Sequence, residues 1–137
     1  MAVDYGDVRT GLAVSDESAT LAGEAWTVLE RDRDAVAGAI AAAAAARGVK
    51  TIVVGHPRNM DGSVGPRAQK SESLAEFLRG LCDIEVVLWD ERMTTVSAHR
   101  VLSDAGKFGK KRKNAVDAVA ASLILENYLQ YLKMQNS

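Results

Sequence analysis

Alternating apolar and polar positions characterise the first thirty residues of the chain. The alternation is found at 2–5, 10–15 and 25–29, with glycine or aspartate between the segments. A period of two residues is typical of strands, and the short separations favour a meander of antiparallel strands. The chain is therefore predicted to begin with three strands.

After residue 30 the pattern changes to alternating helices and strands. Helix propensity, β-branched runs and turn residues predict a helix at 32–47, a strand at 49–55, a loop at 56–65, a helix at 67–81, a strand at 85–89 and helices at 94–105 and 114–133. Gly48 suits the position after a helix, Pro57 ends a strand, and Pro66 can open a helix. The boundaries are thus supported by local turn chemistry.

This order of elements predicts an α/β fold built on a mixed sheet. Right-handed crossovers make the later strands parallel, while the initial meander forms the other edge of the sheet. Helices should cover both faces. The length of 137 residues is that of one ordinary domain and no linker divides the chain. We expect a single domain over 1–137.

Composition limits the functional classes. A net charge of −1 and a pI near 6.1 exclude a globally basic nucleic-acid packer, so any site for a polyanion must be local. The single cysteine, Cys82, cannot form an internal disulfide. The alanine-rich stretch at 35–46 is too short to span a bilayer. We therefore expect a cytoplasmic protein with no membrane role.

One such local site lies near the C-terminus, where four cations precede a small, apolar helix that contains Asp117. The cations are Lys110, Lys111, Arg112 and Lys113. This juxtaposition suits a phosphodiester that is held by cations and cut at a metal. The alternative is structural, with Asn114 as the helix cap and Asp117, three residues later, completing an arrangement like a capping box.

Two further acids stand at predicted strand ends. Asp4 is the only charge in the first strand and Gly6 follows it closely, whereas Glu91 follows the strand at 85–89 at the carboxyl edge where α/β sheets place their sites. Asp4 could instead be a solvated acid, and Asp90 and Arg92 could form a structural ion pair. Carboxylates without histidine or thiolate partners select Mg²⁺ or Mn²⁺, and two such ions could activate a water.

Other polar residues give weaker signals. Arg58, Arg67 and Arg92 are candidates for phosphate contacts, because the loop at 56–65 leaves the same edge of the sheet. The two histidines and the cysteine have no partners at the spacing of zinc ligands. No combination of serine, cysteine and histidine indicates a nucleophilic triad.

Four segments of the chain closely resemble the YqgF/RuvX family of RNase H-like nucleases. In order, they read AVDYGDVRTGLAVSD, IVVGHPRNMDGSVGPRAQ, WDERMTT and KKRKNAVDAVAA. The resemblance covers essentially the whole chain and implies a five-stranded mixed sheet in the order 3-2-1-4-5, with Asp4, Glu91 and Asp117 as its acidic triad. Two features depart from the family: the chain begins three residues before Asp4, and His56 stands where an apolar residue is more usual.

Family members are described as Holliday junction resolvases and as nucleases that process the 5′ end of precursor 16S ribosomal RNA. The resemblance implies a divalent-metal-dependent endonuclease, with ribosomal RNA the preferred substrate and branched DNA the alternative. Asp4 and Asp117 would hold the metals, Glu91 would ligate a metal or orient water, and residues 110–113 would bind the nucleic-acid backbone. A homodimer would suit a symmetrical junction.

Two other functions compete with this interpretation. The sequence D-x-G followed by a hairpin also resembles the phosphate loop of sugar and acetate kinases, although those folds need a second domain to close over ATP. The protein could also bind ribosomal RNA through its basic run without cutting it.

Overall fold

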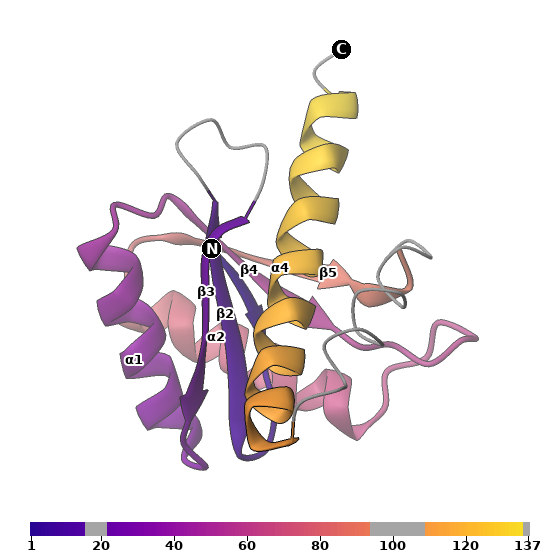
Figure 1. The fold of residues 1–137 in the computed structure, drawn as a ribbon. Helices are drawn as coiled ribbons and strands as arrows, with labels where there is room; N and C mark the ends of the chain where they lie inside the picture. The colour runs from indigo at the N-terminus through magenta and orange to yellow at the C-terminus, as the bar shows by residue number, and fades with distance from the viewer. Residues whose placement is uncertain (16–21, 94–108, 136–137) are drawn as a thin grey trace.

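A computed structural model describes the backbone at residues 1–15, 22–93 and 109–135 and the side chains at 1–15, 23–93 and 117–135. Its elements are β1 (Ala2–Asp4), β2 (Arg9–Ser15), β3 (Ala22–Leu29), α1 (Arg33–Ala46), β4 (Thr51–His56), α2 (Pro66–Leu81), β5 (Glu85–Asp90), the 3-10 helix η1 (Glu91–Met93) and α4 (Gly109–Gln135) (Figure 1). The element order agrees with the sequence prediction. The helix predicted at 94–105 lies outside the described residues.

The strands form one mixed sheet in the order β3-β2-β1-β4-β5, which confirms the order implied by the family resemblance. β1 pairs antiparallel with β2 and parallel with β4, and β4 pairs parallel with β5. In this register Asp4 is opposite Gly11, and His56 is opposite Asp90. The carboxyl ends of β1, β4 and β5 therefore meet at one edge of the sheet.

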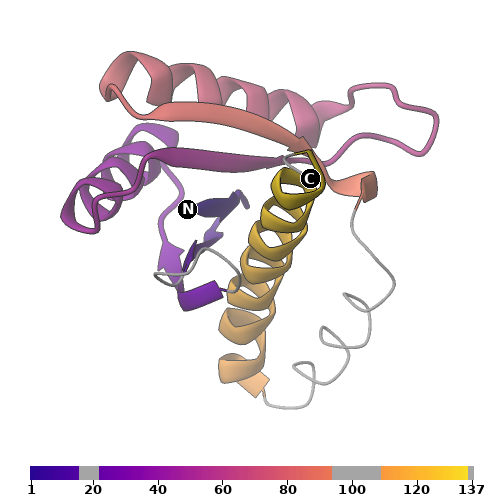
Figure 2. The same ribbon diagram turned by 90° about the horizontal axis from the view of Figure 1, so that it is seen from above.

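Helices cover both faces of the sheet, as predicted. One core unites α1 and α2 with alternate strand residues such as Val3, Leu12 and Val54, and a second core packs α4 against their neighbours, which include Ala2 and Ala13. Figure 2 shows α1 and α2 on one side of the sheet and α4 on the other. Successive residues of a strand point to opposite faces, so each central strand contributes to both cores.

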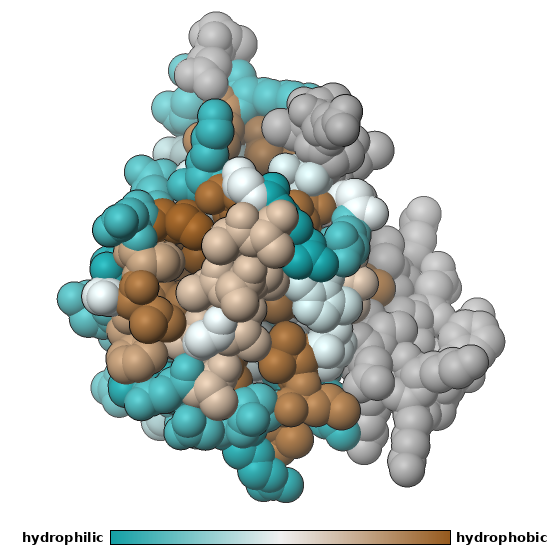
Figure 3. All heavy atoms as spheres, turned by 90° about the vertical axis from the view of Figure 1, so that its left-hand side faces the viewer, coloured by the Kyte–Doolittle hydropathy of each residue, from teal (hydrophilic) through white to brown (hydrophobic). Residues whose placement is uncertain are grey.

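Local chemistry explains the position of α1. Asp32 caps this helix by accepting a hydrogen bond from the backbone of Ala35, and Gly48 follows its end with a φ of 65°. Ala37 and Ala44 are buried against the sheet, and other alanines of the helix remain exposed. Figure 3 views the side that carries α1, where apolar side chains gather within a rim of polar ones.

The start of α4 corrects one prediction. The helix begins at Gly109, so Asn114 lies inside it and is not its N-cap. Lysine and arginine are good helix formers, and the helix therefore extends back through residues 110–113. Asp117 lies about two turns beyond the start of the helix. The capping-box alternative for Asp117 is thus wrong. Among the described residues, the helices include none long and apolar enough to cross a membrane.

Candidate active site

Asp4 and Asp117 are brought together by a close contact between β2 and α4. Asp4 is the last residue of β1, and its partner in the ladder is Gly11 of β2. A methyl group added at Gly11 would overlap the backbone carbonyl of Asp117. The backbone of α4 therefore lies directly against β2 at the position next to Asp4, and only glycine permits this approach.

Glu91 reaches the same edge from the other side of β1. It is the first residue of η1 and follows β5 immediately. A methyl group added at Gly55 of β4 would lie 3.2 Å from the Glu91 carboxyl carbon and 2.9 Å from the Ile124 side chain. The Glu91 side chain thus packs over β4, in space that a second glycine leaves open.

Burial raises the pKa of all three acids, and a neighbouring carboxylate adds to the shift of Asp4 and of Glu91. Burial, with the nearby Asp117 carboxylate as a second cause, raises the pKa of Asp4 from 3.8 to about 6. Burial and then Asp4 raise the pKa of Glu91 from 4.5 to about 7. Burial also raises the pKa of Asp117, and Arg9 opposes that shift. Asp4 is therefore the acid that interacts with both of the others.

The Asp117 carboxylate has an oxygen that a bound cation could satisfy. Its Oδ2 atom is buried and accepts no hydrogen bond from the residues that the structure describes. A buried carboxylate oxygen without a donor is costly, and hard oxygen ligands of this kind suit Mg²⁺ or Mn²⁺. Within the part of the chain that the structure describes, however, no three acidic, histidine or cysteine side chains converge on one point at ligand spacing. The three acids are therefore neighbours that a metal ion could join, with Asp4 interacting with both of the others, and as described they do not form a preassembled ligand cluster.

The candidate arginines Arg67 and Arg92 interact with different acids. Arg67, the second residue of α2, is exposed and lowers the pKa of both Asp4 and Glu91. Arg92 instead forms a two-pronged ion pair with Asp90, with Nη2 at 2.7 Å from Oδ2 and Nε at 3.0 Å from Oδ1. Asp90 and Arg92 therefore form the structural ion pair that the sequence allowed as the alternative. Arg67 is thus the candidate arginine whose charge acts on Asp4 and Glu91, while Arg9, which the sequence did not single out, acts on Asp117.

His56, itself buried, forms a partly buried bridge that the sequence did not predict. It is the last residue of β4 and not part of the loop, and it is 3% exposed. Its Nε2 lies 3.2 Å from a carboxylate oxygen of Glu72 on α2, and its Nδ1 accepts a hydrogen bond of 3.2 Å from Nε of Arg58. A neutral ring with its proton on Nε2 satisfies both contacts. The bridge ties the start of the following loop to α2.

A cavity lies away from the acids, and the basic run at residues 110–113 has no described side chains. A cavity of about 520 Å³ opens at the opposite end of β1, with Met1, Ser15 and Thr51 in its lining, and contains none of the three acids. The side chains of Lys110, Lys111, Arg112 and Lys113 lie outside the described residues. Their position in the sequence places them in the first turns of α4, before Asp117.

The sheet order, the covering helices and the acids at the carboxyl ends of β1 and β5 define an RNase H-like fold. A solved structure of this class, described as T. thermophilus RuvC in complex with Holliday junction substrate, matches with a TM-score of 0.54 and 14% identity over 94% of this chain and 92% of that one. That likeness concerns the fold.

Sequence comparison gives the family. The model described as "RuvX: Holliday junction resolvase" matches residues 1–131, and the chain belongs to this family. A relative from Halothermothrix orenii is 44% identical over 96% of this chain and 94% of its own length. Another, from Halalkalibacterium halodurans, is 41% identical over 94% of both chains. Both carry the name "putative pre-16S rRNA nuclease".

Proposed function

We propose that this protein is a divalent-metal-dependent nuclease that hydrolyses phosphodiester bonds in structured nucleic acid. The observation that carries the proposal is the grouping of Asp4, Glu91 and Asp117, from three elements, around one sheet edge. Burial is the main cause of their raised pKa values, with a neighbouring carboxylate as a second cause for Asp4 and Glu91, and buried carboxylates held near one another are costly without a cation. Membership of the RuvX family supports the same chemistry.

Each acid has a distinct role in this mechanism. Asp4 and Asp117 would hold Mg²⁺ or Mn²⁺ through carboxylate oxygens, and the Oδ2 of Asp117, which has no hydrogen-bond partner among the described residues, would be one such ligand. When bound, these ions polarise phosphate oxygens and make water more acidic. Glu91, whose pKa is raised to about 7, is suited to accept a proton from the attacking water near neutral pH. Arg67 is positioned to contact the phosphate.

Precursor 16S ribosomal RNA is the substrate we propose, with cleavage at its 5′ end by endonuclease action. The names of the curated relatives support this choice. Four cations in the first turns of α4 oppose the helix dipole, so an anionic backbone there would be favourable. This processing belongs to ribosome biogenesis, and we infer from it that the protein acts in the cytoplasm. Branched DNA is the second candidate, because the family description names Holliday junctions.

A parallel cleavage assay tests both the chemistry and the substrate. An RNA with the 5′ flank of pre-16S rRNA and a four-way DNA junction are each offered to the protein in Mg²⁺, in Mn²⁺ and in EDTA. We expect the RNA to be cut in either metal, and the variants Asp4→Asn and Asp117→Asn to lose at least a hundredfold in rate, as is typical when a group that acts in the transition state is removed. Cleavage of the RNA by these variants at the wild-type rate would refute the assignment.

The same assay separates the remaining alternatives. Cutting of the junction alone would favour the resolvase function, for which two active sites in a homodimer are needed, and sedimentation would then test for the dimer. A protein that only binds ribosomal RNA would instead show salt-sensitive binding that is unchanged by metal or by Asp4→Asn. Saturable binding of ATP without RNA would revive the kinase interpretation.

A further inference from the structure

The loop at residues 57–65, here called the finger, is braced by its own hydrogen bonds. Asn59 donates its backbone amide to the carbonyl of Ser63 at 3.0 Å and its side-chain amide to the Ser63 hydroxyl at 2.9 Å. Asp61 accepts bonds from both the backbone and the hydroxyl of Ser63, and Gly62 turns the chain with a φ of 88°. These hydrogen bonds favour one shape for the turn at residues 59–63.

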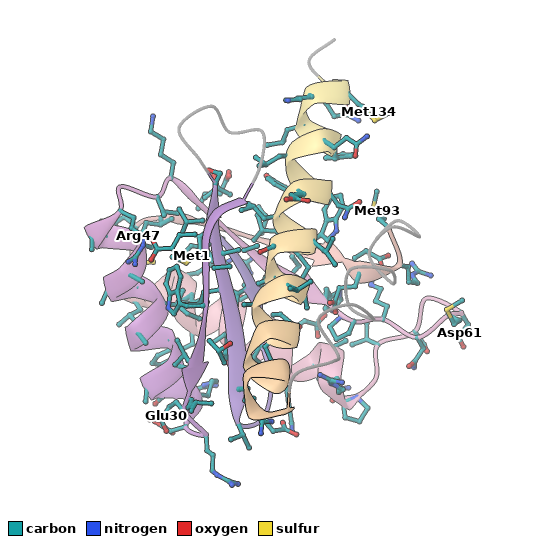
Figure 4. The ribbon with its side chains drawn as sticks, in the orientation of Figure 1. Met1, Glu30, Arg47, Asp61, Met93 and Met134 are labelled. Carbon is teal, nitrogen blue, oxygen red and sulfur yellow. The ribbon has the colours of Figure 1, made fainter. Side chains whose placement is uncertain are left out.

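The tip of the finger carries Met60, which is 92% exposed. A single exposed apolar side chain is common on protein surfaces and means little by itself. Met60 differs because it sits on a hydrogen-bonded turn of polar residues that projects from the sheet. Figures 1 and 4 show the finger reaching outward, with its neighbour Asp61 far from the core. The Met60 side chain is therefore accessible to a partner.

The finger also belongs to the active-site edge and has two guanidinium groups at its base, of which that of Arg92 is paired with Asp90. It starts directly after β4, where Arg58 is held by His56. Gly62 lies over Arg92, since a methyl group added there would be 3.3 Å from the guanidinium. Arg92 in turn follows Glu91. An apolar tip at the active-site edge, with Arg58 near its base donating a hydrogen bond to His56, suits a nucleic acid, in which phosphates flank stacked bases.

We propose that Met60 inserts between stacked bases of the substrate and opens a base step beside the bond to be cut. The inference rests on the proposed nuclease function and adds how structure in the substrate is recognised. Apolar wedges, methionine among them, are known to unstack base steps in this way, and the methionine thioether makes favourable contacts with aromatic rings. Arg58 would then contact the phosphate that flanks the opened step.

Fluorescence of 2-aminopurine provides the test, because its emission rises when the base is unstacked. The probe is placed at the duplex end next to the 5′ flank in a pre-16S hairpin RNA, and beside the branch in a four-way DNA junction. Wild type, Met60→Ala and Met60→Leu are compared, with Leu81→Ala as the control. Leu81 is 47% exposed at the far end of α2, so its truncation removes a similar apolar group away from the site.

We expect wild type, Met60→Leu and Leu81→Ala to raise the emission, and Met60→Ala to lose the rise. Loss of the methionine contact should lower kcat/KM on the structured RNA by roughly two- to tenfold, while an unstructured oligonucleotide is cut at the wild-type rate. An unchanged rise and rate for Met60→Ala would overturn the proposal, and so would an equal loss on both RNAs.

The emission separates this inference from the function on which it rests. Asp4→Asn should still raise the emission, because opening a base step does not require cleavage. If wild type raises the emission but cuts neither substrate, the wedge stands as a binding device and the nuclease function fails. If wild type cuts the RNA and Met60→Ala behaves identically, the nuclease stands and the wedge is wrong.

Discussion

Replacing Asp4 by asparagine tests the energetic cost of the acid cluster without reference to substrate. Asparagine has nearly the same shape and carries no charge. In the folded protein the pKa of Asp4 is about 6, whereas its ordinary value is 3.8. At pH 4 the carboxyl of the folded protein is protonated and costs little. As the pH rises through 6, the buried carboxylate ionises and folded wild type loses stability that the variant keeps.

The magnitude follows from the pKa itself. A tenfold change in proton affinity corresponds to about 1.4 kcal/mol, so moving the pKa from 3.8 to about 6 costs the ionised folded state about 3 kcal/mol. For 137 residues the entropy of unfolding converts this free energy to a Tm change of about 10 °C. The Tm difference between Asp4→Asn and wild type should therefore be about 10 °C larger at pH 8 than at pH 4, in favour of the variant.

Thermal unfolding at pH 4 and pH 8, in EDTA and in Mg²⁺, measures these effects. Mg²⁺ should raise the Tm of wild type at pH 8, because binding at the acids stabilises the folded state, and should have little effect on Asp4→Asn. Asp7→Asn is the matched control, since Asp7 is an exposed acid near the same strand that pairs with Lys70 at 2.8 Å. A difference between variant and wild type that is the same at pH 4 and pH 8 would refute the reasoning.

Three further predictions use the same preparations. Gly11→Ala should destabilise the protein by about 1–3 kcal/mol in urea unfolding, because its methyl group meets helix backbone, whereas Gly38→Ala, which meets nothing within 4 Å, should be neutral or stabilising. Arg67→Ala should move the acidic limb of the pH–rate profile to higher pH, because the substitution removes a charge that lowers the pKa of Asp4 and Glu91. The control Lys70→Ala should leave that limb unchanged. His56→Ala should cost about 1–3 kcal/mol of stability, because a buried side chain and its two hydrogen bonds are lost, and equal urea midpoints would contradict it.

The sequence predicted much of the fold because its signals are local. Alternation in the first strands, the β-branched run before Pro57 and the glycine after α1 each set an element within a few residues of its observed bounds. The last helix was predicted to start too late. Asn114 is a good cap in isolation, but the helix propensity of the preceding cations carried the helix back to Gly109.

The site was less accessible from the sequence, because its geometry depends on contacts between distant segments. Asp4, Glu91 and Asp117 could be selected as acids at the ends of elements, and their roles stay proposals. The function of Gly11 could not be foreseen, since nothing near it in sequence indicates that a helix about a hundred residues later will touch it. The same holds for His56, whose partner Glu72 lies on another element.

The contact at Gly11 also determines how the active site can vary. Where two packed elements are separated by side chains, each substitution in the core changes their spacing by the size of the group. At this point main chain meets main chain, and the spacing is set by the thickness of the polypeptide. The distance between the acids of β1 and α4 is therefore insulated from mutational drift in the surrounding core. Redesign of that core could alter stability while the gap between these two carboxylates stays constant.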